Sequence, residues 1–176
     1  MSYGVVRTDN MYATDVRGGG LVSIKYIVTT GSGNEEVKTE TAIENGNVLK
    51  IGDLMEGERE VLEGSAPAAN TPLGDICLVA TPELMCDERK HGLDKFINEA
   101  GRICRGYRLH HADTFSVTAD ALATSLSEIE VGNIVELQAG TKMKVVASAT
   151  SGSTTVGKII AIEPAGSYLF YVILVD

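Results

Sequence analysis

The last third of the chain consists of short apolar runs separated by turn residues, and this pattern restricts the fold more than any other feature. From Thr114 onward nearly every run is bounded by Gly, Ser, Asn or Pro. Such spacing is typical of strands in a small antiparallel β module. The last run is entirely apolar, which predicts a central strand covered on both faces. The strands predicted in this way are 115–118, 134–138, 141–148, 156–162 and 168–175.

The first half of the chain contains further strand patterns. Residues 21–29 alternate between apolar and polar side chains, as expected for a strand with one buried face. Within the segment 41–51, Asn45-Gly46 separates two short apolar pieces. This dipeptide predicts a hairpin, because both central positions of a type I′ turn need positive φ. Two more short strands are predicted at 59–63 and 76–80.

The helical pattern of apolar residues extends over a short segment. It covers residues 93–100, where four apolar residues share one face and Gly101 stands at the position of a C-cap. A second helical turn is predicted to begin at Thr81-Pro82-Glu83, since Pro is favoured at the first helical position. The fold class is therefore mainly β with one or two short helices, as an antiparallel β-barrel or β-sandwich whose C-terminal part is most clearly β.

A chain of 176 residues corresponds to one domain, or to one domain with a smaller lobe. We expect an irregular N-terminal arm, a β-rich lobe with the short helix, and a C-terminal antiparallel module. The lobe and the module can also form one continuous domain. These parts cover residues 1–20, 21–112 and 113–176.

The charge balance bears on possible partners. The chain has 15 Lys and Arg against 24 Asp and Glu, for a net charge of -9, and no basic stripe that would neutralise phosphates, so nucleic acid is not an expected partner. The longest apolar run, eight residues, is shorter than the roughly 20 that a membrane helix needs. Because residues 1–7 lack the pattern of a signal peptide, we expect a protein that stays in the cytosol until it joins a partner.

The residues capable of metal binding are poorly spaced for it. A structural zinc site needs two close ligand pairs, whereas the cysteines here lie 9 and 18 positions apart, and adjacent histidines on a strand face opposite ways. We therefore predict no metal site and reduced, mostly buried thiols. The residues considered are Cys77, Cys86, Cys104, His91, His110 and His111.

No catalytic or cofactor-binding residue is predicted either. The chain has no Gly-x-Ser-x-Gly elbow, and its Gly-rich stretches at 18–20 and 31–33 lack the residues that follow in a phosphate loop. Carboxylates near the predicted helix, Asp87, Glu88, Asp94 and Glu99, are explained by the helix dipole and by solubility. Tyr107, between Arg105 and Arg108, is expected at a subunit contact.

A series of segments, taken in order, resembles small head proteins of tailed bacteriophages and prophages of Gram-positive bacteria, among them capsid decoration, or cement, proteins. Each segment consists mostly of strand and turn residues, and their order extends over about 43–175. The segments are 43–48, 57–61, 80–84, 94–100, 105–107, 113–118 and 156–160.

This resemblance implies a non-enzymatic virion protein that binds the capsid exterior and braces neighbouring major capsid subunits. Its partners would be the major capsid protein and further copies of itself, with a trimer suggested by analogy, and it would be made in the bacterial host cytoplasm. Negative charge would disfavour contact with packaged DNA. We expect the segment 1–20, together with some loops, to make capsid or neighbour contacts.

Two other function classes remain open from the sequence. One is a carbohydrate-binding or receptor-binding β domain displayed on a virion, although Trp is absent and aromatic residues are only 5% of the chain. The other is a small enzyme whose site forms between subunits, with His110, His111 and Asp113 as its residues. Such a site would require these side chains to share a cleft.

Overall fold

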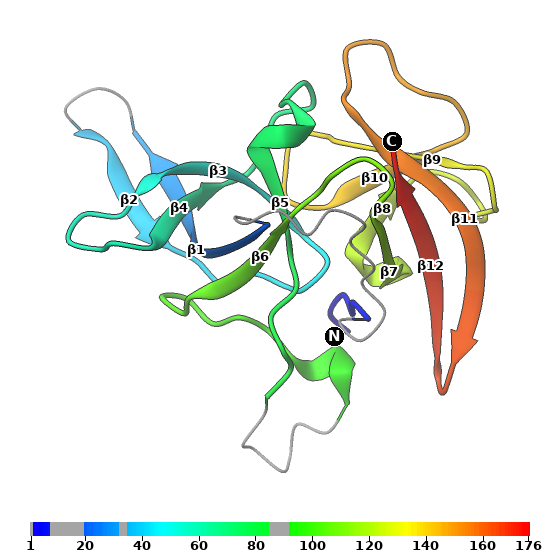
Figure 1. Ribbon diagram of the computed structural model, residues 1–176, viewed down its shortest axis with the longest axis horizontal. Coiled ribbons are helices and arrows are strands. Elements are labelled where there is room, and N and C mark those ends of the chain that lie inside the picture. Colours follow the sequence, from blue (N-terminus) through cyan, green and yellow to red (C-terminus); the bar gives the residue numbers. More distant parts are fainter. Residues whose placement is uncertain (1, 8–19, 32–34, 85–91) are drawn as a thin grey trace.

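The computed structural model describes residues 2–7, 20–31, 35–84 and 92–176 (Figure 1). These residues form two six-stranded sheets, one in the first part of the chain and one in the last. The protein is therefore mainly β, as predicted. Among the described residues no helix combines the length and the apolar character that a membrane crossing requires.

Five strands of the first sheet close into a barrel. β1 pairs in parallel with β4 and antiparallel with β6, and the ring is completed through β3 and β5. β2 lies outside the ring, on the end of β1. The strands are β1 (Leu21–Thr30), β2 (Val37–Glu40), β3 (Val48–Leu54), β4 (Val61–Ser65), β5 (Ile76–Val79) and β6 (Cys104–Arg108).

Two glycines lie where the barrel strands leave little room for a side chain. A Cβ on Gly64 would lie 2.8 Å from Leu49 Cδ1, and a Cβ on Gly106 would lie 2.7 Å from Cys77 Sγ. Because real Cβ atoms essentially never approach this closely, a larger residue at either strand position would force the neighbouring side chains to shift. The interior of the ring is filled by the side chains of the neighbouring strands.

The second sheet is open and has the order β7-β12-β11-β9-β10-β8. All its pairs are antiparallel except β8 with β10. Figure 1 shows β11 and β12 as a long hairpin on the side of the molecule away from the barrel. The strands are β7 (Thr114–Thr118), β8 (Leu122–Thr124), β9 (Ile134–Glu136), β10 (Met143–Val146), β11 (Thr155–Ala165) and β12 (Tyr168–Val175).

The terminal strand is an interior strand, as predicted. β12 has β7 on one side and β11 on the other. Its two faces are not equally covered, however, because Tyr171, Ile173 and Val175 on one face are all buried, whereas on the other face Phe170 is buried but Val172 and Leu174 are half-buried. The expected cover on both faces is therefore complete on the face toward the shared core and partial on the other.

The short helical elements are single 3-10 turns: η3 (Leu73–Asp75), η4 (Leu93–Lys95) and η5 (Ala119–Ala121). The helix predicted over 93–100 is wrong beyond its first turn. Phe96 is already extended, and Asn98 forms a β-bridge with Ile43. The backbone groups of this segment therefore bond to another segment instead of to the next helical turn. Residues 81–84 are likewise not helical.

The Asn45-Gly46 turn forms, with a φ of +84° at Gly46, but it does not join a hairpin. The residues before it pair with Asn98, and β3 after it pairs with β4 and β5. The turn itself is buried, and Gly46 N–H donates to Val79 O at 2.8 Å. A local hairpin was the wrong prediction because both flanking pieces find distant partners.

Residues 2–7 belong to the fold. Val5 and Val6 are 1% and 2% exposed, and Val6 forms a β-bridge with Val117 of β7. Thr118 N–H donates to Val5 O, and Arg7 N–H donates to Ser116 O, both at 3.0 Å. This part of the expected arm is therefore committed to the edge of the second sheet, while residues 8–19 lie outside the described structure.

One apolar core extends across both sheets. It joins Val48, Ile76 and Leu78 of the barrel strands to Phe115 and Ile173 of the second sheet. A second, smaller cluster fills the barrel and contains Ile24, Ile43, Leu49, Cys77, Val79 and Cys104. The barrel is thus attached to the second sheet through buried side chains, and it also has an interior of its own.

Candidate functional site

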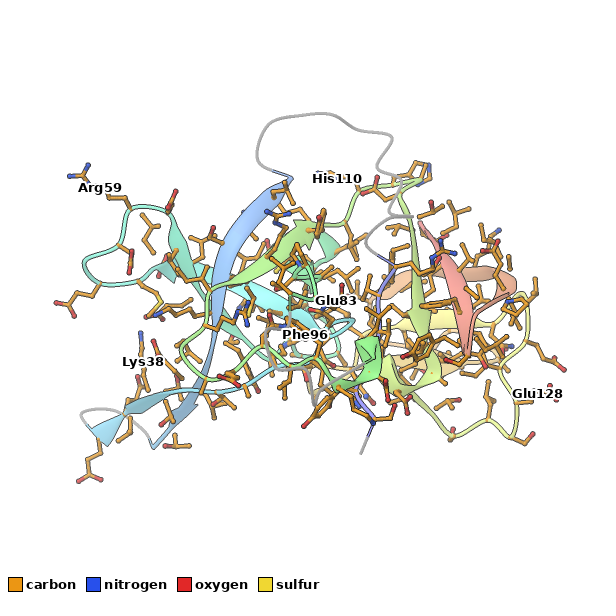
Figure 2. All side chains as sticks on the ribbon, turned by 90° about the horizontal axis from the view of Figure 1, so that it is seen from below. Lys38, Arg59, Glu83, Phe96, His110 and Glu128 are labelled. Atoms are coloured by element: carbon orange, nitrogen blue, oxygen red, sulfur yellow. The ribbon has the colours of Figure 1, made fainter. Side chains whose placement is uncertain are left out.

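The residues of the hypothetical intersubunit enzyme lie at the connection between the two sheets. Asp113 Oδ2 accepts a hydrogen bond from His110 N–H at 2.9 Å and lies 3.6 Å from His110 Nδ1. Asp113 is buried, His110 is half-buried and His111 is exposed. Ala112 between them has a φ of +69°, so the Asp113 carboxylate stabilises a tight turn. Figure 2 shows His110 at the periphery of the molecule.

The two described cysteines are reduced and buried, as predicted for them. Burial raises the pKa of Cys77 to about 12 and that of Cys104 to about 11. The register places Cys77 opposite Arg108, four positions from Cys104 on β6, or about 13 Å along the strand. This separation exceeds the span of a disulfide. Cys86 lies outside the described residues.

Over the described ranges, no three His, Cys, Asp or Glu side chains gather as a metal site requires. Asp94 and Glu99 do not flank a common helix, because η4 ends at Lys95. His91, Asp87 and Glu88 fall outside these ranges, so the structure does not place them relative to the others.

A buried polar cluster, which no sequence pattern predicts, surrounds Asn45. Its side-chain Nδ2–H donates to Thr81 O at 2.8 Å, and its Oδ1 accepts from Thr81 N–H and from Asn98 Nδ2–H, both at 3.1 Å. Asn98 is fully buried. These bonds tie the Asn45-Gly46 turn to the segment after β5 and to the segment before β6. The cluster positions the barrel wall and is structural.

The segments tied in this way border a surface groove of about 340 Å³ beside β1 and β6. Leu21 and Ile103 stand on it and are 55% and 47% exposed. Thr81 Oγ1 accepts a hydrogen bond from Arg105 N–H at 3.0 Å, which joins two walls. The groove combines exposed aliphatic side chains with one arginine, a residue type enriched at protein interfaces. Its residues are Leu21, Val22, Ser23, Thr81, Pro82, Ile103, Cys104 and Arg105.

Tyr107, Arg105 and Arg108, which were expected to form one subunit contact, lie in different surroundings. Arg105 is exposed and borders the groove, whereas Tyr107 packs against the core shared by the two sheets. Arg108 donates from Nη1 to Gly74 O at 3.3 Å. Of these three residues, Arg105 is thus the one that is exposed beside the groove. The sequence could not predict their different positions, because Gly106 interrupts the alternation of side chains along β6.

A second exposed region lies at the outer end of the barrel. Lys38 on β2 contacts Glu63 on β4 at 2.7 Å, and this hydrogen bond raises the pKa of Lys38. Val37 and Leu54 are 58% and 52% exposed. Lys38 and Arg59 project outward at this end in Figure 2. This region therefore combines charged side chains with exposed aliphatic ones.

Glu136 on β9 is a buried carboxylate, 1% exposed. Thr150 N–H donates to its Oε2 at 2.9 Å, and Lys144 Nζ lies 3.5 Å from its Oε1. Burial opposes its ionisation, but the bonds from Thr150 and the lysine outweigh burial and lower the pKa of Glu136. It anchors the loop between β10 and β11. A single Glu in a strand carries no sequence signal for that role.

Comparison of the chain with protein-family models, with curated proteins and with solved structures found no match.

Proposed function

We propose that this protein is a structural virion protein that binds the outer surface of a phage capsid and stabilises it. The proposal rests first on the ordered resemblance to phage head proteins across residues 43–175. It would act without chemistry of its own, as one of many copies on a repeating lattice where each contact contributes modestly.

The groove beside β1 and β6 is the observation that carries the proposal. Leu21 begins β1 and Ile103 directly precedes β6, and both strands belong to a closed barrel, so the backbone that carries these side chains needs little ordering when a partner covers them. We assign the groove to a segment of the major capsid protein, with Leu21 and Ile103 as apolar anchors and Arg105 at the rim. The acidic net charge, -9, is compatible with a position away from packaged DNA.

The test is co-sedimentation of the purified protein with expanded capsids that lack it. The wild type is expected to bind stoichiometrically, and Leu21→Arg and Ile103→Arg are expected to weaken binding about tenfold or more, as for central interface residues. Val131→Arg is the matched control, because Val131 is 59% exposed on a loop of the second sheet. If the wild type does not bind expanded capsids, the proposal is wrong.

Self-association is tested separately by sedimentation of the free protein. A trimer that persists in Leu21→Arg would assign copy-to-copy contacts to another surface, such as the outer end of the barrel. A trimer that dissociates in this variant would move the groove from the capsid interface to the interface between copies.

A further inference from the structure

A second hollow, of about 490 Å³, opens where four segments of the chain meet. The beginning of the chain, η4, η5 and the first residues of β12 each supply part of its wall. It shares no lining residue with the groove beside β1 and β6. Its volume lies within the range of about 300–1,000 Å³ that small-molecule sites occupy. The side chains used below are Ser2, Asp94, Asp120, Tyr168, Leu169 and Tyr171.

One carboxylate of the hollow is held in a fixed orientation. Lys95 Nζ lies 2.9 Å from Asp94 Oδ2, and the Tyr168 hydroxyl donates to Asp94 Oδ1 at 3.0 Å. The lysine first, and then the tyrosine, lower the pKa of Asp94. The carboxylate is therefore a preorganised acceptor with lone pairs left for a ligand, since each carboxylate has about four acceptor positions.

The backbone around Asp94 is shaped to allow this arrangement. Gly92 has a φ of +107°, and a Cβ there would lie 2.7 Å from Asp94 Oδ1 and 3.5 Å from the Tyr168 hydroxyl. Tyr3 N–H donates to Asp94 O at 3.0 Å, which fixes the beginning of the chain beside η4. The walls of the hollow are thus joined to one another without any ligand.

The second carboxylate, Asp120, is exposed. Among the described residues, Ser2 Oγ donates a long hydrogen bond, 3.3 Å, to its Oδ2. Lys142 Nζ donates to Asp120 O at 2.7 Å and lies 3.4 Å from Glu44 Oε2. Of the two carboxylates, Asp94 therefore has a lysine beside it, whereas Lys142 bonds to the main-chain oxygen of Asp120. The pairing with Lys95 reduces the attraction of Asp94 for a cation, while the oxygens of both carboxylates remain good acceptors for neutral donors.

The remaining wall is apolar and aromatic. Tyr168 and Leu169 begin β12, with Leu169 47% exposed, and Tyr171 is 9% exposed. Tyrosine offers a large apolar surface at low entropic cost together with a polar tip. A ligand for this hollow needs both an apolar face and several hydroxyl donors.

We propose that this hollow binds a neutral saccharide, with its C–H surface against Tyr168, Leu169 and Tyr171 and its hydroxyls donating to Asp94 and Asp120. This activity does not depend on capsid binding, because the two sites use different residues. A protein with both sites could hold a capsid through the barrel and a glycan through the hollow at the start of β12.

The test uses the isolated full-length protein and a panel of neutral mono- and disaccharides built from hexoses and N-acetylhexosamines, with binding followed by saturation-transfer NMR and quantified by calorimetry. At least one sugar is expected to bind with a millimolar or lower Kd. Asp120→Ala and Leu169→Arg are expected to weaken it about tenfold or more. Leu54→Arg is the matched control, an exposed leucine at the outer end of the barrel, and circular dichroism checks the fold of each variant.

Three outcomes would overturn the inference. The first is the absence of binding by every sugar of the panel to the folded protein. The second is sugar binding that survives both Asp120→Ala and Leu169→Arg. The third is binding of spermidine in place of the sugars with loss in Asp120→Ala, which would assign the hollow to a cationic ligand. Capsid co-sedimentation of the same variants is expected to be unchanged, so failure of this inference is distinguishable from failure of the proposed function.

Discussion

In the barrel, β1 pairs with both β4 and β6, so five strands form a closed ring, whereas the second sheet stays open between β7 and β8. The open sheet covers one of its edges with residues 2–7, whose backbone bonds to β7. The barrel leaves β2 as a short outer strand whose four residues are all exposed. The unpaired backbone groups of an edge strand can pair with another chain. The second sheet covers one such edge with residues 2–7, whereas the barrel strands pair in a ring and leave only the short strand β2 outside it.

The difference shows which parts of the surface are available to partners. Because the barrel needs no covering segment, its outer wall can carry exposed aliphatic side chains such as Leu21 and Ile103. The second sheet uses one face for the shared core and one edge for the beginning of the chain. Residues 2–7, expected at a partner contact, are therefore part of the folded body, and the groove on the barrel is the contact surface that we propose.

The strongest challenge to this comparison is to remove one large side chain from each core. Phe115→Ala, in the shared core, is expected to lower the free energy of unfolding by about 3–5 kcal/mol, and Ile24→Ala, inside the barrel, by about 2–5 kcal/mol. Both side chains are fully buried. Since the shared core joins the sheets, denaturant unfolding of either variant should remain a single transition by near-UV and far-UV circular dichroism. Two separated transitions would show that the sheets unfold independently.

The covered edge of the second sheet can be compared with the outer strand of the barrel. Val6→Ala is expected to lower the free energy of unfolding by about 1–2 kcal/mol, because Val6 is buried against β7. Hydrogen exchange of the Arg7 and Thr118 amides, which bond across this edge, should accelerate. Val37→Ala on β2 is the control and should change stability by less than about 0.5 kcal/mol. Equal effects of the two substitutions would remove the distinction between the edges.

Glu136 provides a test within the second sheet alone. Glu136→Gln is expected to lower the free energy of unfolding by about 1–2 kcal/mol at pH 7, since bonds to a charged acceptor are weakened. The pKa of Glu136 is lower in the folded protein, so its contribution is complete above the unfolded-state pKa and is lost as the pH falls through the folded-state pKa. The difference between wild type and variant should therefore shrink on acidification.

The control for this pH series is Glu128→Gln, in an exposed position on the same part of the chain (Figure 2). It should have the stability of the wild type within about 0.5 kcal/mol at every pH. A Glu136→Gln difference that stays constant between pH 7 and about pH 3 would contradict the role assigned to the charged carboxylate.

The smallest perturbation is a thiol-labelling experiment on the barrel. In a Cys86→Ser background, Cys77 and Cys104 should react with a thiol reagent at pH 8 only when the barrel opens, because burial raises the pKa of both thiols. The increase in labelling rate per kcal/mol of lost stability should be larger for Ile24→Ala, inside the barrel, than for Val6→Ala. Labelling at the rate of an unfolded peptide would mean that the barrel interior is not closed.

Much of the second sheet could be predicted from the sequence, because its strands are local apolar runs bounded by turns. The prediction for 168–175 coincides with β12, and 115–118 differs from β7 by one residue. The strand β8 was not predicted, because Leu122–Thr124 is too short to show an alternation of apolar and polar residues. Its partner β10 is parallel and distant, which no local signal reports.

The barrel was harder to predict for two physical reasons. Gly64 and Gly106 stand where a strand would show an apolar side chain, so the alternation of β4 and β6 is interrupted at the positions that let the barrel close. The segment 93–100 has helical periodicity, yet its backbone pairs with Ile43. Long-range pairing outweighed local propensity in both cases.

The candidate sites were still less predictable. The groove and the hollow each join segments far apart in the chain, such as Leu21 with Ile103 and Ser2 with Tyr168. No spacing in the sequence links these residues. Conversely, His110, His111 and Asp113 were considered as enzyme residues because of their side-chain types. In the fold, Asp113 stabilises a turn.

We propose that the barrel wall beside β1 and β6 contacts a capsid from outside. The decisive experiment is electron cryomicroscopy of expanded capsids incubated with the protein. We predict regularly spaced density on the outer surface, into which the protein fits with Leu21 and Ile103 facing the shell and the β11–β12 hairpin facing away. Absence of ordered external density at saturating protein, or a fit in which the second sheet faces the shell, would contradict the account.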